Sequence, residues 1–271
     1  MAGLRGCLAI LVIAVLVAWP QARSRDLQTR TLASVWYRGT PAGVPRPVDI
    51  EAIAATGFSA VTWPMLQVSG ASELRRMAES AGLQVVIRTE PVPLTTESAL
   101  RPDTHVDLLV PQTPVPQYPA LIWRAVAHGA RVISFDAGAA EGNALLDQSG
   151  RPAAWVAPVS AVARDLVRNA TMIDLLTAGP AIRIDPPAPG LDIVLLDARR
   201  SWVLIATNAS PAGTPPADTY AYLPRPVPPA EWLNLFDGST ISMLRRATDV
   251  RWRVVLGPGD VRVYAIGKTE G

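Results

Sequence analysis

Residues 120–136 read ALIWRAVAHGARVISFD, and this stretch predicts a helix followed at once by a strand. The helical run from Ala120 to Ala127 ends at Gly129, a residue that commonly terminates helices. The next run, 131–135, is short and rich in β-type residues, and it stops beside Asp136. A helix that ends in glycine and leads directly into a strand is typical of the repeating unit of a parallel α/β sheet.

The same alternation continues outward from this stretch. Strands are expected at 31–37, 58–63, 83–88 and 106–110, and helices at 48–56, 72–82 and 156–176. With 131–135 this makes five strands within residues 27–179. At roughly 30 residues for each strand–helix unit, about five units fit into that length, whereas a closed eight-stranded (β/α) barrel needs about 200–250 residues.

The chain changes character after residue 179. Residues 180–271 contain short β-type runs, several of them bounded by turn pairs, with proline-dense stretches at 185–190 and 211–229. One of the β-type runs, 221–223, lies inside the second of these stretches. No helical period persists in this part of the chain. The expected fold is therefore α/β followed by all-β, the second part being a small antiparallel β-sandwich domain.

The N-terminal segment 1–22 has the order of a secretory signal peptide, with an early arginine, an apolar run and a short polar end. This predicts a secreted or periplasmic bacterial protein. Contact with a membrane is expected only if the segment is not cleaved. Cys7, the single cysteine, lies within it, so the processed chain would contain no disulfide.

Charge and motifs exclude several classes of function. The 25 Lys and Arg residues nearly balance the 23 Asp and Glu residues and form no basic run, which argues against a nucleic-acid partner. The sequence contains no glycine-rich nucleotide loop and no nucleophile elbow. Its two histidines, His105 and His128, have no spacing typical of a zinc site. No cofactor and no metal are expected.

Residues 120–152 resemble the end of the catalytic barrel in β-galactosidase-like glycoside hydrolases (family 42-like, clan A). The stretch Ala127-His-Gly-Ala130 leads into a strand, and the segment LLDQSGRP at 145–152 precedes a long helix and a β-domain. The closing run GDVRVYAI at 259–266 is similar to the β-domains that end such enzymes. The resemblance implies a (β/α) barrel fold and a carbohydrate ligand.

The resemblance also implies that the usual catalytic machinery is absent. Retaining members of the family are expected to carry an acid/base Glu after barrel strand four and a nucleophile Glu after strand seven. If the run 131–135 matches strand eight, strand seven ends at Val110 and Pro111, which are not carboxylates. Strands four to six have no counterpart. The chain therefore resembles an incomplete barrel of about five units, that is, a pseudoenzyme.

Three acidic residues remain as candidates for chemistry at the strand ends. Glu90 follows the third strand, Asp136 ends the fifth, and Glu141 lies on the next loop. Glycoside hydrolysis needs two facing carboxyl groups, so the functional interpretation pairs Glu90 as proton donor with Asp136 as base or nucleophile. In the alternative interpretation Glu90 is a solvated loop residue and Asp136 orders a loop.

Three aromatic residues lie near the same strand ends and are candidates for binding a sugar. Trp36, Tyr37 and Trp63 would each offer a ring to the apolar face of a sugar if exposed. The alternative is that the tryptophans pack under the helices. His128 ends a helix at the opposite edge of the sheet, where a capping or packing role is expected.

Two functions from different classes fit these observations. One is an exported glycoside-hydrolase-like protein, divergent or degenerate in catalysis, and the other is a non-catalytic scaffold of the cell envelope that binds carbohydrate or protein. Five strands leave two open sheet edges, which must be covered by connectors or paired in a homodimer.

Overall fold

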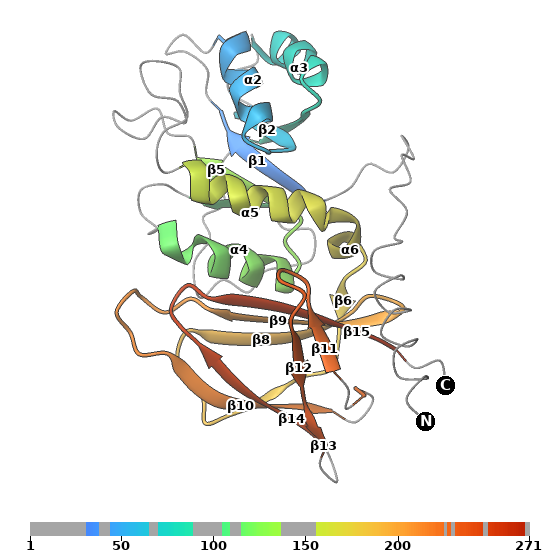
Figure 1. Cartoon of the computed structure of the whole chain (residues 1–271). Helices are drawn as coiled ribbons and strands as arrows, with labels where there is room; N and C mark the ends of the chain where they lie inside the picture. Colours follow the sequence, from blue (N-terminus) through green and yellow to red (C-terminus); the bar gives the residue numbers. More distant parts are fainter. Residues whose placement is uncertain are drawn as a thin grey trace.

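The computed structural model describes residues 31–37, 44–64, 70–88, 105–108, 115–136, 156–224, 227–228, 231–245 and 249–268. Figure 1 shows a helix-rich part, formed by the earlier residues, stacked on a part made of strands. The predicted Glu90 and Glu141 lie outside the described residues.

The first part contains a five-stranded parallel sheet, which confirms the parallel strands predicted from the sequence. Its strands are β1 (Leu32–Trp36), β2 (Ala60–Pro64), β3 (Gln84–Arg88), β4 (His105–Leu108) and β5 (Val132–Asp136). Their spatial order is β3-β2-β1-β5-β4, so the last strand pairs in parallel with the first. The strand at the centre of the sheet is therefore β1, and β3 and β4 are its edges.

The helices that accompany this sheet alternate with its strands along the chain. They are α2 (Pro47–Ala55), α3 (Ala71–Ser80), α4 (Tyr118–Ala127), α5 (Val156–Arg168) and α6 (Ala170–Asp174), with a 3-10 turn η2 (Val115–Gln117) before α4. Three predicted helix stops have the left-handed backbone that glycine adopts readily, with φ of +97° at Gly57, +76° at Gly82 and +102° at Gly129. The chain turns at each of these residues and enters a strand.

The second part contains two antiparallel sheets. One has the order β13-β14-β10-β7 and the other β12-β11-β15-β9-β8-β6. The strands are β6 (Thr177–Ala178), β7 (Arg183–Asp185), β8 (Leu191–Asp197), β9 (Ser201–Asn208), β10 (Ala217–Pro224), β11 (Glu231–Asn234), β12 (Thr240–Ser242), β13 (Leu244–Arg245), β14 (Asp249–Leu256) and β15 (Val261–Gly267). Side chains from both sheets share one apolar cluster, to which Leu204, Leu223, Trp232 and Val254 belong.

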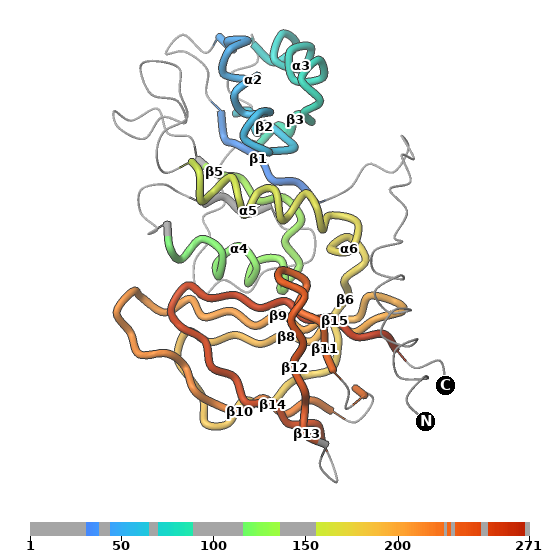
Figure 2. The backbone as a smooth tube through the Cα atoms, in the orientation of Figure 1, coloured from blue at the N-terminus to red at the C-terminus, as the bar shows by residue number. Residues whose placement is uncertain are grey.

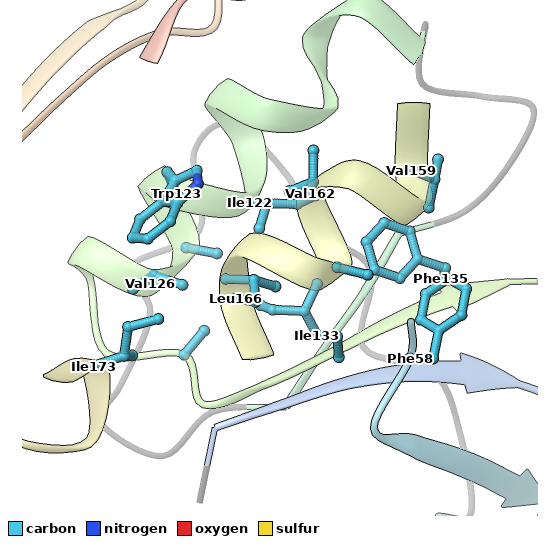
Figure 3. Close-up of a cluster of buried hydrophobic side chains, with 14 of the residues drawn as sticks. Phe58, Ile122, Trp123, Val126, Ile133, Phe135, Val159, Val162, Leu166 and Ile173 are labelled. Carbon is cyan, nitrogen blue, oxygen red and sulfur yellow. The ribbon is translucent and has the colours of Figure 1, made fainter. Parts of the chain in front are cut away.

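A single larger cluster joins the helices to one face of the parallel sheet and to the six-stranded sheet (Figure 3). Alternate residues of β1, β2 and β5 enter it, as the two-residue period of a strand requires. Helix α4 lies between the two parts in Figure 2 and contacts β8, β9 and β15 as well as α5. Eight of its ten residues are buried, which is typical of a helix packed on more than one side.

The structure differs from the sequence prediction at two places. The helix expected at 156–176 is interrupted at Asn169, whose side-chain amide donates to the Asp165 carbonyl (2.8 Å) and so competes with the helical backbone bond to that oxygen (3.1 Å). The segment 211–229, expected to be a connector with one short β-type run at 221–223, contains the longer strand β10. Within this strand the only proline is its last residue, Pro224, so the prolines do not interrupt its hydrogen bonds with β14.

Two buried hydroxyls, those of Tyr118 and Thr207, have no hydrogen-bond partner among the described residues. Tyr118 at the start of α4 is 1% exposed and packs edge-on against Phe135. Burial raises the pKa of Tyr118 to about 12 from 10.0. Below pH 10 the Tyr118 hydroxyl is protonated in both the folded and the unfolded state. Above pH 10 the unfolded state loses this proton first, so the free energy of unfolding falls as the pH rises from 10.0 to about 12.

We therefore expect Tyr118→Phe to raise the free energy of unfolding by about 1–3 kcal/mol at about pH 8, because it removes an unsatisfied buried hydroxyl. The gain should increase further as the pH rises from about 10 toward about 12. Urea unfolding of both proteins at about pH 8 and about pH 11 measures this. A difference that is negative or independent of pH contradicts the prediction.

Candidate functional site

The site predicted from the sequence is the edge of the parallel sheet where the strands end, because ligands of barrels and open α/β sheets bind at that edge. The register places Trp36 beside both Thr62 and Asp136, and Pro64 beside Arg88. Trp36 and Thr62 lie on the sheet face opposite to the one that enters the helix cluster. The structure thus brings the predicted Trp36 and Asp136 together on neighbouring strands.

Hydroxyl groups line the same face, beside Trp36 at Thr62 and one step deeper at Ser34 and Ser134. Ser34, Thr62 and Ser134 come from β1, β2 and β5, and each is fully buried. The Thr62 hydroxyl lies 2.8 Å from the hydroxyls of both Ser34 and Ser134 and is hydrogen-bonded to each. This row of three hydroxyls is therefore satisfied within the protein and closed to solvent.

We expect Thr62→Val to lower the free energy of unfolding by about 1–3 kcal/mol, because valine keeps the volume while Ser34 and Ser134 each lose a buried hydrogen bond. Chemical denaturation measures the change. The matched control, Ser34→Ala, removes only one of the two bonds and should cost less. An equal or smaller loss in Thr62→Val would contradict the central place of Thr62 in the row.

Trp36 is the only candidate aromatic residue on this face. Its side chain is 4% exposed, and its buried indole N–H has no hydrogen-bond partner among the described residues. An unpaired buried donor is uncommon in proteins. The ring is enclosed, so it does not offer an open platform to a sugar at the sheet edge where a ligand was expected.

Tyr37 and Trp63 lie on the other face, contrary to the prediction that they bind substrate. Both belong to the cluster under the helices, and their ring centroids are 5.8 Å apart. The Tyr37 hydroxyl donates to Asp49 (2.6 Å), which also accepts two bonds from Arg46 (2.8 and 2.6 Å). Burial, together with this bond to Asp49, holds the pKa of Tyr37 far above its usual value. These groups fix the start of α2 against β1.

The acidic candidates are placed only in part. Asp136 ends β5 opposite Trp36, while Glu90 and Glu141 fall outside the described residues. The pairing of Glu90 with Asp136 as donor and base therefore stays a prediction.

His128 has the capping position that the sequence predicted. It is the C-cap residue of α4, and its Nε2 lies 2.6 Å from the Asp192 carboxylate of β8, which also forms an ion pair with Arg124 (3.4 Å). These contacts join α4 to the six-stranded sheet. His105 begins β4 beside Val132, at the opposite edge from Trp36.

A cavity that no sequence pattern predicted lies near His128. A space of about 490 Å³ separates the end of α4 from β6 and β8, and its lining includes Val126, Arg131, Leu176, Ile182 and Leu195. Arg131 donates there to the carbonyls of Ala130 (2.9 Å) and Leu176 (3.0 Å). The cavity lies at the starting edge of the parallel strands, away from Trp36 and Asp136.

Among the described residues, no cluster of three His, Cys, Asp or Glu side chains could hold a metal ion. No helix there is both long enough and apolar enough to cross a membrane.

Comparison with known proteins gives weak structural likeness and no sequence family. No family model and no curated protein matches the chain. An α-fucosidase from Thermotoga maritima, solved with fucose, is 10% identical over 81% of this chain and 78% of its own, with a TM-score of 0.46. An α-amylase from Geobacillus thermoleovorans, solved with acarbose, is 9% identical over 80% and 62%, with a TM-score of 0.40. A protein from Bacillus halodurans, described as an α-N-acetylgalactosaminidase, is 9% identical over 82% of this chain and 61% of its own, with a TM-score of 0.40.

Similarity to these three proteins at this level of identity and TM-score assigns neither a family nor an activity to this chain. The chain spans only about three fifths of the amylase and of the Bacillus protein. The resemblance to β-galactosidase-like enzymes therefore stays a hypothesis.

Proposed function

We propose that this chain is a carbohydrate-binding protein that derives from a glycoside hydrolase barrel and does not cleave its ligand. In this proposal the parallel sheet is an incomplete (β/α) barrel of five strands, and the two antiparallel sheets are the β-sandwich that follows the barrel. The observation that carries it is the strand order β3-β2-β1-β5-β4, with β5 paired in parallel to β1.

This order supports a barrel origin for a topological reason. A closed barrel has no edges, so its last strand must pair with its first. In this chain, the last strand of the sheet, β5, pairs with β1, although two edges remain at β3 and β4. If β4 and β5 correspond to barrel strands seven and eight, barrel strands four to six have no counterparts among the described strands of this chain. The expected acid/base Glu would have been lost with them.

Loss of hydrolysis is supported by the buried hydroxyl row. A hydrolase must admit substrate and water to the inner face of its barrel at the ends of the strands. On that face Ser34, Thr62 and Ser134 are fully buried and bonded to one another, and Trp36 is almost fully buried. Substrate has no open surface at these positions.

Hydrolysis of a panel of aryl glycosides tests the proposal, alongside binding of oligosaccharides to the same preparation. We expect no turnover above background by the wild-type chain, the Glu90→Gln variant or the Asp136→Asn variant, and binding in all three. Turnover by the wild-type chain that either variant abolishes would show that the chain is an enzyme with this carboxylate pair. Binding of proteins but of no carbohydrate would favour a protein-binding scaffold instead.

The proposal includes export, which rests on the signal-like order of residues 1–22. Expression of the full chain in a bacterium, followed by fractionation and mass measurement, tests it. A periplasmic or secreted product that lacks this segment supports export. A product of full mass retained in the membrane would instead show that the segment is an uncleaved anchor.

A second copy of the chain is the proposed partner of the open sheet edge. Strand β3 pairs only with β2 among the described strands, and its Ile87 is 39% exposed. A charged residue on an edge strand opposes pairing with another sheet. We expect light scattering to give twice the 28.9 kDa chain mass for the wild type and a single chain mass for Ile87→Lys. A monomeric wild type would contradict this edge-to-edge dimer.

A further inference from the structure

The outer face of the four-stranded sheet carries an unusual set of side chains. Alternate residues of β10 and β14 point into the shared apolar cluster, which includes Ala221, Leu223, Trp252 and Val254. The residues between them therefore lie on the outer face. Those outer residues include three arginines, two tyrosines and two exposed aliphatic side chains: Arg183, Arg251, Arg253, Tyr220, Tyr222, Leu244 and Val255.

Cations and aromatic rings alternate across this face. The Arg183 guanidinium lies 3.9 Å from the centroid of the Tyr222 ring, and the Arg251 guanidinium lies 3.5 Å from that of Tyr220 and 5.9 Å from that of Tyr222. The register explains the order, because Tyr222 pairs with Arg183 of β7 on one side and with Arg251 of β14 on the other. The tyrosine rings thus hold two guanidinium groups in place over the sheet.

The three arginines differ in their carboxylate partners. Arg253 binds Asp218 through two bonds (3.0 and 2.7 Å), and Arg183 binds Asp185 (3.0 Å). Arg251 forms no ion pair within the described part of the chain, and its Nε is buried without a hydrogen-bond partner. Among the described residues it is therefore a guanidinium without an ion-pair partner, stacked on the Tyr220 ring and near the Tyr222 ring.

The arrangement favours an anion over the two other ligands that aromatic sheet faces commonly bind. A neutral sugar needs an uncovered ring face, but a guanidinium lies over each tyrosine. A nucleic acid strand needs base-stacking faces and a net basic groove, whereas two of the three arginines are neutralised by their own aspartates. A carboxylate needs only the free donors of one planar guanidinium.

We propose that Arg251, held against the rings of Tyr220 and Tyr222, binds a carboxylate of an acidic glycan, that is, a chain of uronic acid units. Leu244 is the register partner of Arg251 and is 70% exposed, so it forms an apolar border for the sugar ring. The choice of a glycan as the carrier of the carboxylate rests on the proposed function. The anion site itself rests only on the geometry of the four-stranded sheet.

Calorimetric titration of the full chain with an oligogalacturonate tests the site, and the fully methyl-esterified oligomer is the matched neutral probe. We expect binding of the acid form only, and at least about tenfold weaker binding to Arg251→Gln. Arg253→Gln, on the same face and strand, removes an arginine that already has a partner and should change the affinity less than about threefold. Arg251→Lys keeps the charge without the planar fork, and intermediate affinity is expected.

Each other outcome overturns a defined part of the proposal. Equal binding of the esterified oligomer, or unchanged affinity in Arg251→Gln, means that Arg251 is not the site, although the chain still binds carbohydrate. Equal binding of a single-stranded oligonucleotide makes the face a general polyanion surface and overturns its selectivity. Binding of an acidic peptide but of no glycan leaves the anion site intact and overturns the proposed function.

Discussion

Trp123→Ala should lower the free energy of unfolding by about 3–5 kcal/mol, the loss typical of a large aromatic side chain removed from a core. Trp123 is 1% exposed and belongs to the cluster that joins the helices to the six-stranded sheet. Figure 3 shows it among the side chains of α4. Its ring also packs edge-on against Phe236, with the centroids 5.4 Å apart.

This loss should affect both parts of the molecule, because α4 contacts the parallel-sheet helix α5 on one side and β8, β9 and β15 on the other. Urea unfolding followed by circular dichroism measures it. The control is Phe236→Ala, which removes the more exposed ring of the same pair and should cost less. The double variant then gives the coupling between the rings, expected at about 0.5–1.5 kcal/mol. A loss below about 1 kcal/mol in Trp123→Ala would show that the two parts are not held together through α4.

Gly259→Ala is the second substitution with a large expected effect. Gly259 has a φ of +82°, and a Cβ at this position would lie 2.4 Å from the Pro116 carbonyl oxygen of η2. The substitution therefore combines left-handed backbone strain with a clash against backbone of the other part of the molecule. We expect a loss of about 2–5 kcal/mol.

Gly238→Ala is the matched control for the backbone conformation. Gly238 has a φ of +72° in a turn of the same β-domain, but nothing lies within 4 Å of a Cβ there. Its substitution should cost only about 1–2 kcal/mol. Thermal or urea unfolding of both variants separates the cost of the left-handed backbone from the cost of the clash with Pro116. Equal losses would mean that the contact of the 257–260 turn with η2 adds nothing to the stability of the fold.

Local chemistry made the parallel strands predictable. Gly57, Gly82 and Gly129 each end a helix with a positive φ, a conformation that costs other residues free energy, so a glycine there marks the helix end whatever surrounds it. The apolar runs that follow these glycines are short enough to be strands. Where a side chain competes with the backbone, as Asn169 does, the periodicity alone predicted a longer helix than the chain forms.

The candidate site was less predictable. The sequence shows that neighbouring strand residues point to opposite faces of the sheet, but it does not show which face packs against the helices. Trp36 and Tyr37 are adjacent, yet one lies on the face of the buried hydroxyl row and the other under the helices. The Arg–Tyr face was missed for a similar reason. Its residues come from β7, β10 and β14, which are far apart in the chain, and β10 lies in a stretch whose prolines predicted a connector.

The sequence by itself determined the succession of helices and strands, the change from α/β to β near residue 180, and the positions of the glycine-ended helices, because each depends on residues close to one another in the chain. Only the tertiary structure decided that β5 lies beside β1, that Thr62 links two serines from other strands, and that Arg251 lies against two tyrosine rings. Those features depend on which strands pair, and pairing is set by the burial of whole faces that no local stretch contains.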